Sequence, residues 1–251
     1  MSEEVLYEKK DNLAFITLNR AEKYNTFNLN LAKKLNEYLM AADNDKDIKL
    51  VIINAKGKHF SCGIDMKEFK DRDYNEMKSV VKLMDLHNHT ITKMSKVVIA
   101  SVRGYALANG AGLSFASDFT IASNNAIFGT TAINVGLLCL GPLVPLTKIV
   151  GKKIALEMIL TGKMISAEEA FRLGIANKVV SDDELETETL NFANEIASKN
   201  QESVRLGKYA INTIMDMPYH YSLDYMSELF SGLTQNEDAK KGVEAFLNKK
   251  K

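Results

Sequence analysis

Short apolar runs alternate with longer amphipathic segments through the first two-thirds of the chain. The short runs are rich in Val and Ile and are bounded by turn residues, which is typical of strands. The longer segments repeat apolar residues at helical spacing. The predicted strands are residues 5–7, 13–18, 50–53, 97–102 and 119–122, and the predicted helices are residues 29–42 and 74–94. Strands that alternate with helices indicate an α/β fold.

From about Gly151 onward the chain predicts almost only helix, because Ser or Thr recurs three residues before Glu. In the pair Ser166 and Glu169, for example, the hydroxyl accepts from an early helix N–H and the carboxylate reaches back to the cap. No low-complexity linker separates the two parts of the chain. The simplest organisation is therefore an α/β core with C-terminal helices packed on it or on neighbouring subunits.

The charge balance and the cysteine count argue against several functions. Lys plus Arg and Asp plus Glu both number 32, so no overall basic excess attracts a nucleic acid. Cys62 and Cys139 are too few for a disulfide framework or a zinc site and suit a reduced cytoplasm. The acidic N-terminus resembles no signal or transit peptide, and the apolar stretch 133–146 is too short and broken to span a membrane. We therefore expect a cytoplasmic protein without a metal, nucleic acid or membrane partner.

Three segments have the composition of a ligand site. Residues 56–65 follow a strand with a turn of small residues, which allows a ligand to approach main-chain N–H groups. Residues 102–113 lead into a helix whose first turn leaves N–H groups unpaired and whose dipole favours negative charge. Residues 126–142 are apolar and suit a pocket wall. The structural alternatives are a capped helix start, close packing of a helix on a sheet, and a core loop.

In this order and at these separations, the segments resemble the enoyl-CoA hydratase/isomerase (crotonase) superfamily over nearly the whole chain. The matching segments are N-R-A-E-K-Y-N-T-F (19–27) to the family's N-R-P-E-K-x-N-A-L, F-S-C-G-I-D (60–65) to F-S-A-G-x-D, the glycine-rich helix start at 104–107, T-G-K-M-I-S-A-E-E-A (161–170), G-I-A-N-K-V-V (174–180) and the closing helix at 237–247. Several such motifs in the right order make the resemblance specific.

The resemblance implies a spiral of ββα turns over residues 1–195 and a helical region over residues 196–251 that builds trimers, often stacked as hexamers. It implies an acyl-CoA thioester as ligand, with no cofactor beyond the coenzyme A moiety. It also assigns the two carbonyl-binding donors to the main-chain N–H groups of Ile64 and Asn109. Such donors stabilise an enolate, and the loss of one typically raises the barrier by about 3–4 kcal/mol.

The acid–base residues depart from the family pattern. Hydratases of the family use two glutamates, and the matching positions here are Gly112 and Ala132. Cys139 lies near the expected site. His89, four residues after Asp85 on one helical face, is a second candidate acid or base. The alternative for His89 is a solvated Asp–His pair on an amphipathic helix.

Contacts to the coenzyme A moiety are expected on the glycine-containing loop, at the start of the glycine-rich helix and near the C-terminus. Cationic side chains suit its phosphates, and an aromatic ring suits its adenine. The expected residues are Lys23, Cys62, Gly63, Asp65, Lys67, Gly110, Phe246 and Lys249. The resemblance implies that the C-terminal contact crosses a subunit boundary.

Three functions remain open. The first is an enzyme that acts on an acyl-CoA through an enolate-like oxyanion, as a hydratase or isomerase, or as a decarboxylase or hydrolase with relocated acid–base groups. The second is a non-catalytic acyl-CoA-binding protein, which the replacement of both glutamates favours. The third is RNA binding, known for some relatives, and the zero net charge opposes it.

Overall fold

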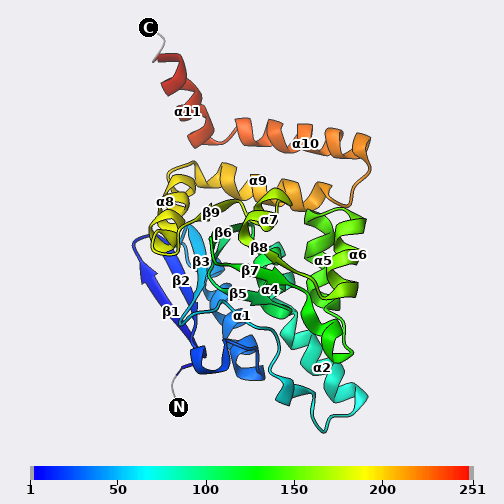
Figure 1. The fold of residues 1–251 in the computed structure, drawn as a ribbon. Helices are drawn as coiled ribbons and strands as arrows, with labels where there is room; N and C mark the ends of the chain where they lie inside the picture. The colour runs from blue at the N-terminus through cyan, green and yellow to red at the C-terminus, as the bar shows by residue number, and fades with distance from the viewer. Residues whose placement is uncertain (1–2, 249–251) are drawn as a thin grey trace. The chain divides into compact units, whose positions relative to one another are not determined.

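The computed structural model of the protein describes residues 3–248. The chain divides into two compact units, residues 1–194 and 195–251. The first unit combines two sheets with helices, and the second unit is helical (Figure 1). The α/β class predicted from the alternation of apolar runs and amphipathic segments is confirmed.

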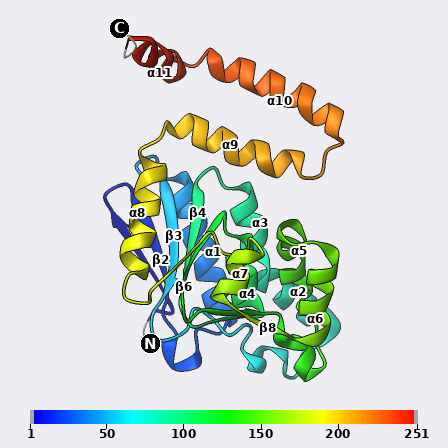
Figure 2. The same cartoon turned by 45° about the horizontal axis from the view of Figure 1, so that its top comes forward.

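A six-stranded sheet runs through the first unit in the order β1-β2-β3-β4-β6-β9, and Figure 2 shows several of its strands side by side. The strands are β1 (Val5–Lys10), β2 (Leu13–Leu18), β3 (Leu50–Ala55), β4 (Val97–Val102), β6 (Phe119–Ser123) and β9 (Lys178–Val180). β1 and β2 form an antiparallel hairpin, and the other neighbours are parallel. All six residues of β4 are buried, because a central parallel strand is covered on both faces.

Three short strands form a second sheet in the order β5-β7-β8. They are β5 (Tyr105–Leu107), β7 (Ile127–Gly129) and β8 (Met164–Ser166). Along the chain, β4 of the large sheet leads to β5 of the small one, and after a helix β6 leads to β7. A parallel bridge between Ser61 and Ala106 brings the chain that follows β3 to the same layer. This repeated passage between the two sheets is the ββα spiral that the resemblance implied.

Helices fill the connections of the first unit. They are α1 (Leu29–Asn44), α2 (Tyr74–Met84), α3 (Leu86–Lys93), α4 (Asn109–Ala116), α5 (Leu140–Ile149), α6 (Lys152–Thr161), α7 (Ala167–Arg172) and α8 (Leu185–Ala197), with the 3₁₀ turns η1 (Ala21–Lys23), η2 (Met66–Phe69) and η3 (Thr131–Val135). The Asn28 side chain caps α1, and the helix buries one apolar face, which includes Leu31, Leu35 and Leu39. α4 packs against α3, α5 and the large sheet, so it lies at the centre of the unit.

The helix predicted over residues 74–94 is two helices, because the chain breaks at Asp85. Asp85 has φ −98° and ψ 0°, closes α2 and opens α3. Its carboxylate accepts from the Asn109 side chain instead of capping α3. A tertiary contact therefore overrides the helical periodicity. The prediction of almost only helix after Gly151 was also wrong at two places, where β8 and β9 form.

The second unit consists of the end of α8 and the helices α9 (Gln201–Ile214), α10 (Tyr219–Thr234) and α11 (Glu237–Asn248). No side chain described in α10 or α11 is buried. The large apolar residues exposed in α9, α10 and α11 include Tyr209, Ile211, Tyr219, Tyr221, Leu223, Phe230, Phe246 and Leu247. Such surfaces are typical of association sites, and the expected trimer stays a prediction. None of the helices within residues 3–248 is long and apolar enough to cross a membrane.

Candidate functional site

The segment that ends at Ile64 runs beside the segment that leads into α4. Ser61 and Ala106 form a parallel bridge, and the Leu107 N–H donates to the Ser61 carbonyl oxygen at 2.8 Å. Ile64 follows Ser61 by three residues, and Asn109 follows Ala106 by three residues. The two predicted donor residues therefore lie the same number of residues beyond the bridge, on neighbouring segments.

The main-chain N–H groups of Ile64 and Asn109 have no acceptor within residues 3–248. Phe27 donates to the Gly63 carbonyl oxygen and accepts from the Asp65 N–H, both at 2.8 Å, so the intervening N–H of Ile64 points away from Phe27. Asn109 is the first residue of α4 and has no preceding helical turn to bond. Both N–H groups therefore keep an unused capacity to donate a hydrogen bond within the described part of the chain.

The backbone beside these donors adopts conformations that few residues tolerate. Gly63 has φ +97°, and Ala108 has φ +48° with ψ −119°. A Cβ on Gly63 would lie 2.8 Å from the Cβ of Ala108 and 3.7 Å from the Asn109 nitrogen. Position 63 therefore requires glycine, both for its φ and for close approach. The conformation of Ala108 costs about 1–3 kcal/mol, and strain of this kind clusters at functional sites.

Gly110 serves the packing of the same two segments. A Cβ on Gly110 would overlap the carbonyl oxygen of Ser61. Its absence lets the first turn of α4 approach the segment that carries Ile64. Close packing of a helix on its neighbour, the structural alternative for this segment, therefore accounts for Gly110.

The first turn of α5 faces α4 at Gly112. A Cβ on Gly112 would lie 2.8 Å from Cγ and 3.1 Å from Cβ of the buried Pro142, so the proline ring fills the space into which a longer side chain would project. Ala132 lies in η3, and its main chain forms a hydrogen bond with Cys139, the residue before α5. Burial raises the pKa of the Cys139 thiol, and the nearby Asp85 carboxylate raises it further. The hydrogen bond with the Ala132 main chain lowers it.

Asp85 lies against both of these helices. Asn109 Nδ2 donates to Asp85 Oδ1 and to the Met84 carbonyl oxygen, each at 3.2 Å. A Cβ on Gly141 would overlap the whole Asp85 carboxyl group. Burial raises the pKa of Asp85, and the Asn109 hydrogen bond and the nearby His89 oppose this. The interpretation of Asp85 and His89 as a solvated pair is wrong for Asp85, which is half-buried, whereas His89 is exposed.

His87 packs on Phe27, the residue that holds Ile64, with ring centroids 5.5 Å apart. It is 2% exposed, and its Nε2 has no partner among the described residues. Burial lowers the pKa of His87 to about 4, against a hydrogen bond with the Met84 main chain. The imidazole is therefore neutral at pH 7. No sequence pattern points to His87, because the polar residues around it give no sign of its burial.

Comparisons with known proteins identify the family of the chain. The family model described as enoyl-CoA hydratase/isomerase matches residues 8–251. The chain belongs to that family. The mitochondrial enoyl-CoA hydratase domain-containing protein 3 of Mus musculus is 34% identical over 250 residues, which cover 97% of this chain and 81% of that protein. The crotonyl-CoA hydratase of Syntrophomonas wolfei is 33% identical, over 99% of this chain and 96% of that protein.

Solved structures of enoyl-CoA hydratase/isomerase proteins share the fold. The human enoyl coenzyme A hydratase domain-containing protein 3 matches with a TM-score of 0.95 and 33% identity, over 98% of both chains. An enoyl-CoA hydratase of Mycobacterium smegmatis matches with a TM-score of 0.95 and 28% identity, over 99% of this chain and 97% of that one. The crotonase fold implied by the sequence motifs is therefore confirmed.

In this member of the enoyl-CoA hydratase/isomerase family, the lysines expected to contact coenzyme A flank the Ile64 loop. Lys23 lies in η1 and Lys67 in η2, and both are exposed. The Asp65 carboxylate accepts from the Lys67 N–H, which caps η2, and from Arg20 Nη2, each at 3.2 Å. Arg20 is 8% exposed and also pairs with Glu4 at 3.0 Å. The loop is thus held by an ion-pair network that the sequence analysis did not identify, although Arg20 lies inside a matched motif.

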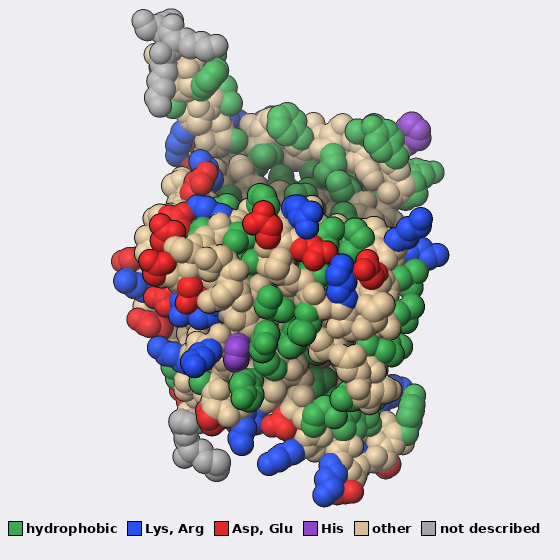
Figure 3. Space-filling model, viewed as in Figure 1, with side chains coloured by type: hydrophobic (Ala, Val, Ile, Leu, Met, Phe, Trp, Pro, Cys, Tyr) green, Lys and Arg blue, Asp and Glu red, His purple; other side chains and the backbone are tan. Residues whose placement is uncertain are grey.

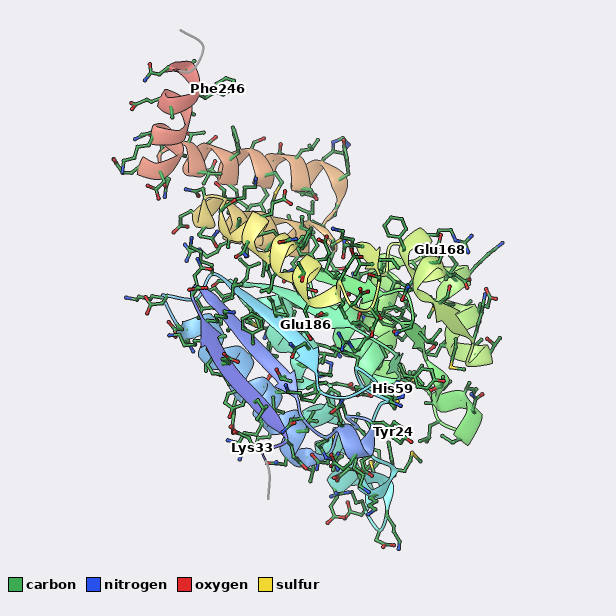
Figure 4. The ribbon with its side chains drawn as sticks, turned by 60° about the vertical axis from the view of Figure 1, so that its left-hand side comes forward. Tyr24, Lys33, His59, Glu168, Glu186 and Phe246 are labelled. Carbon is green, nitrogen blue, oxygen red and sulfur yellow. The ribbon has the colours of Figure 1, made fainter. Side chains whose placement is uncertain are left out.

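The other coenzyme A candidates have different surroundings. Cys62 is half-buried, and burial raises its pKa to about 11, so its sulfur is a neutral thiol at pH 7. Phe246 lies in α11 of the second unit and is 59% exposed (Figure 4). Lys249 lies outside the described residues. The first unit therefore brings together the candidates between Lys23 and Gly110, and Phe246 belongs to a separate unit.

An aromatic column of Tyr24, His59 and Tyr105 flanks the same loop, and Figure 4 shows Tyr24 and His59 as neighbours. The His59 ring stacks on Tyr105 with centroids 4.6 Å apart and planes 11° apart. His59 Nδ1 accepts from the Tyr105 N–H at 3.2 Å, and burial lowers the pKa of His59. These contacts give His59 a structural role. Within the described part of the chain, no group of three or more His, Cys, Asp or Glu side chains suits a metal ion.

Proposed function

We propose that this chain binds an acyl-CoA thioester and holds its carbonyl oxygen between the N–H groups of Ile64 and Asn109, as an enoyl-CoA hydratase/isomerase-like enzyme. The observation that supports this is the pair of unpaired N–H groups on adjoining segments, one of them at the start of a helix. Reaction at the α- or β-carbon moves electron density onto the thioester oxygen. Two preorganised donors stabilise that charge, at about 3–4 kcal/mol each, and the helix dipole acts in the same direction.

The acid–base residues set the proposal apart from the two-glutamate hydratases. By the resemblance, the glutamates correspond to Gly112 and Ala132. Pro142 lies against Gly112, so a glutamate there requires α5 to shift. Among the other candidates, Cys139 has a raised pKa, which disfavours a thiolate, and His89 is exposed. The enolate-stabilising part of the site and its proton-transfer part therefore need separate tests.

A non-catalytic acyl-CoA-binding protein is the second candidate, and the ring of Pro142 against Gly112 favours it. A decarboxylase or hydrolase with relocated acid–base groups is the third. Decarboxylation forms the enolate by loss of CO₂, so it needs the two donors but no protein base to begin.

Binding and turnover measurements separate these candidates. Crotonyl-CoA is the first substrate to test, because relatives are named crotonyl-CoA hydratase and short-chain-enoyl-CoA hydratase. We expect saturable binding of butyryl-CoA and loss of the crotonyl-CoA double-bond absorbance. Free coenzyme A, which lacks the thioester oxygen, is the control for binding. Malonyl- and hydroxyacyl-CoA cover decarboxylation and hydrolysis. Tight binding without any product indicates the non-catalytic protein, and failure of every thioester to bind contradicts the proposal.

We also propose assembly as a homotrimer or hexamer, supported by the exposed apolar side chains of α10 and α11. Light scattering during gel filtration checks this, and a monomer at micromolar concentration would contradict it. We further propose a reducing compartment such as the cytoplasm, which the two free cysteines support. Because several relatives are named as mitochondrial, cell fractionation is the test.

RNA binding has less support. On the face drawn in Figure 3, acidic and basic side chains are interspersed, and the formal net charge is zero. Nucleic acid binding draws its affinity from clustered Lys and Arg. A salt-dependent RNA mobility shift at physiological ionic strength would reverse this conclusion.

A further inference from the structure

The break between α2 and α3 brings a carboxylate to the donor site. Asp85 stands at that break, and its Oδ1 accepts from the side chain of Asn109, whose main-chain N–H is one of the two unpaired donors. A Cβ on Gly141, in the first turn of α5, would overlap Oδ1, Cγ and Oδ2 of the same carboxyl group. Its titratable neighbours are His89 on α3 and Cys139 at the start of α5.

Two consecutive residues of α5 account for this arrangement. Pro142 presses on Gly112, which excludes a long side chain from α4. Gly141 has no Cβ, and only for that reason does the Asp85 carboxyl group fit against it. The same helical turn therefore excludes a carboxylate from α4 and admits one from the α2–α3 break. A Cβ added at either Gly112 or Gly141 would bring atoms into overlap.

We propose that Asp85 is the group that carries the proton in this site, an inference that rests on the acyl-CoA function proposed above. In the addition of water, the Asp85 carboxylate takes a proton from water as the water oxygen bonds to the β-carbon. The π electrons of the Cα=Cβ bond form a double bond between the α-carbon and the carbonyl carbon, and the carbonyl π electrons move onto the thioester oxygen, which the N–H groups of Ile64 and Asn109 hold. The Asp85 carboxylic acid then returns its proton to the α-carbon as the thioester carbonyl re-forms. One water is added, and the carboxylate is regenerated.

The surroundings of Asp85 suit this role. Burial raises its pKa, and the Asn109 hydrogen bond limits the rise because it favours the charged form. A carboxyl group whose pKa moves toward neutrality is a better acid and base near pH 7 than an exposed one. The Asn109 side chain also fixes the carboxylate relative to the donor on the same residue. A separate base at the Gly112 or Ala132 position is then not required.

The variant Asp85→Asn tests the proposal, because an amide oxygen still accepts from Asn109 but holds no proton in exchange. Asp71→Asn is the matched control. Asp71 is exposed, forms only a 3.9 Å pair with Lys70 and has φ +54°, which asparagine tolerates. Asp85→Glu is the second variant and keeps the acid. Three readouts are measured for each: butyryl-CoA binding by calorimetry, crotonyl-CoA hydration from pH 4 to 9, and exchange of the butyryl-CoA α-hydrogens in D₂O.

We expect Asp85→Asn to bind butyryl-CoA like the unaltered protein and to lose about 10²–10⁴-fold in hydration and exchange, the usual contribution of a general acid–base group. The acid limb of kcat/KM should disappear from its residual activity. Asp85→Glu should keep part of the activity, and Asp71→Asn all of it. If Asp85→Asn retains hydration and exchange, Asp85 is not the proton carrier and the acyl-CoA function stands. If the unaltered protein binds butyryl-CoA without hydration or exchange, the proposal is overturned in favour of a non-catalytic protein. If it binds no thioester, the proposed function fails first.

Discussion

The two sides of the candidate site are built differently. The donor side, from Phe60 to Ile64 and from Ala106 to Gly110, is hydrogen-bonded to its neighbours, and Phe60, Ser61 and Ala106 are fully buried. The facing wall, from η3 to the start of α5, leaves most of its side chains in solvent, and Val135 and Leu140 are each 62% exposed.

The buried side contributes main-chain groups to the candidate site, whereas the exposed wall contributes side chains. The donors are N–H groups whose direction follows from strand register and a helix start, so packing constrains them whatever side chains the residues carry. The wall contributes side chains, and exposed positions accept substitution at small cost to stability. We therefore interpret this site as one in which the proposed oxyanion donors are constrained by the fold, whereas the exposed side chains of the facing wall are free to vary.

The largest expected effect comes from Gly63→Ala, which attacks the donor side. The methyl group meets the Cβ of Ala108 at 2.8 Å, and φ +97° is unfavourable for alanine. Displacement of one donor should reduce turnover of whichever thioester is processed by about 10²–10³-fold. Steady-state kinetics and thermal unfolding measure the two consequences. Gly151→Ala is the control, since its Cβ meets nothing within 4 Å, and equal losses in both variants would refute the interpretation.

The second-largest expected effect is a pH dependence of folding stability that comes from the buried His87, which packs on Phe27. Its pKa is about 4 in the folded protein against an ordinary value of 6.5, so the unfolded chain binds an extra proton between these values. The free energy of unfolding should therefore be constant with respect to this group above pH 6.5 and fall by roughly 3 kcal/mol toward pH 4. Urea unfolding from pH 4 to 8 measures it. His87→Gln should flatten this part of the profile, and an unchanged slope would contradict the assignment.

A smaller effect is expected on the wall side from Gly112→Glu. The new side chain meets Pro142, so we expect about 1–3 kcal/mol of destabilisation from overpacking and no gain in hydration. Pro142→Ala combined with Gly112→Glu should lose less than the sum of the two single variants. Chemical denaturation of all four proteins measures the coupling. Strict additivity would show that the ring of Pro142 does not limit position 112.

The smallest effect should follow Cys62→Ala, which installs the residue of the family motif beside Gly63. The thiol has a pKa of about 11 and is neutral at pH 7, so it supplies neither charge nor a nucleophile. We expect turnover within about twofold of the unaltered protein, because neutral small side chains at a half-buried position exchange with little effect. A loss of more than tenfold would give Cys62 a direct role.

Sequence alone predicted the longer strands, since the Val- and Ile-rich runs at 50–53 and 97–102 became β3 and β4. It missed the three-residue strands β5, β7, β8 and β9, which are too short to show a periodic pattern. It failed at Asp85, where the apolar periodicity continues but the chain breaks to serve Asn109. Periodicity reports which face of a helix is buried, not where a polar side chain finds a distant partner. The motifs led to Ile64 and Asn109, and no sequence pattern revealed the strained Ala108 between them in space.

The bridge between Ser61 and Ala106 has a consequence for how this site evolves. Ile64 follows Ser61, and Asn109 follows Ala106, by three residues, so the two stretches between bridge and donor have equal length. One inserted or deleted residue in either stretch would slide one amide by about 3.3 Å, more than the length of a whole hydrogen bond. Lineages of this chain can thus substitute residues other than Gly63 in these stretches, but they cannot lengthen or shorten the stretches.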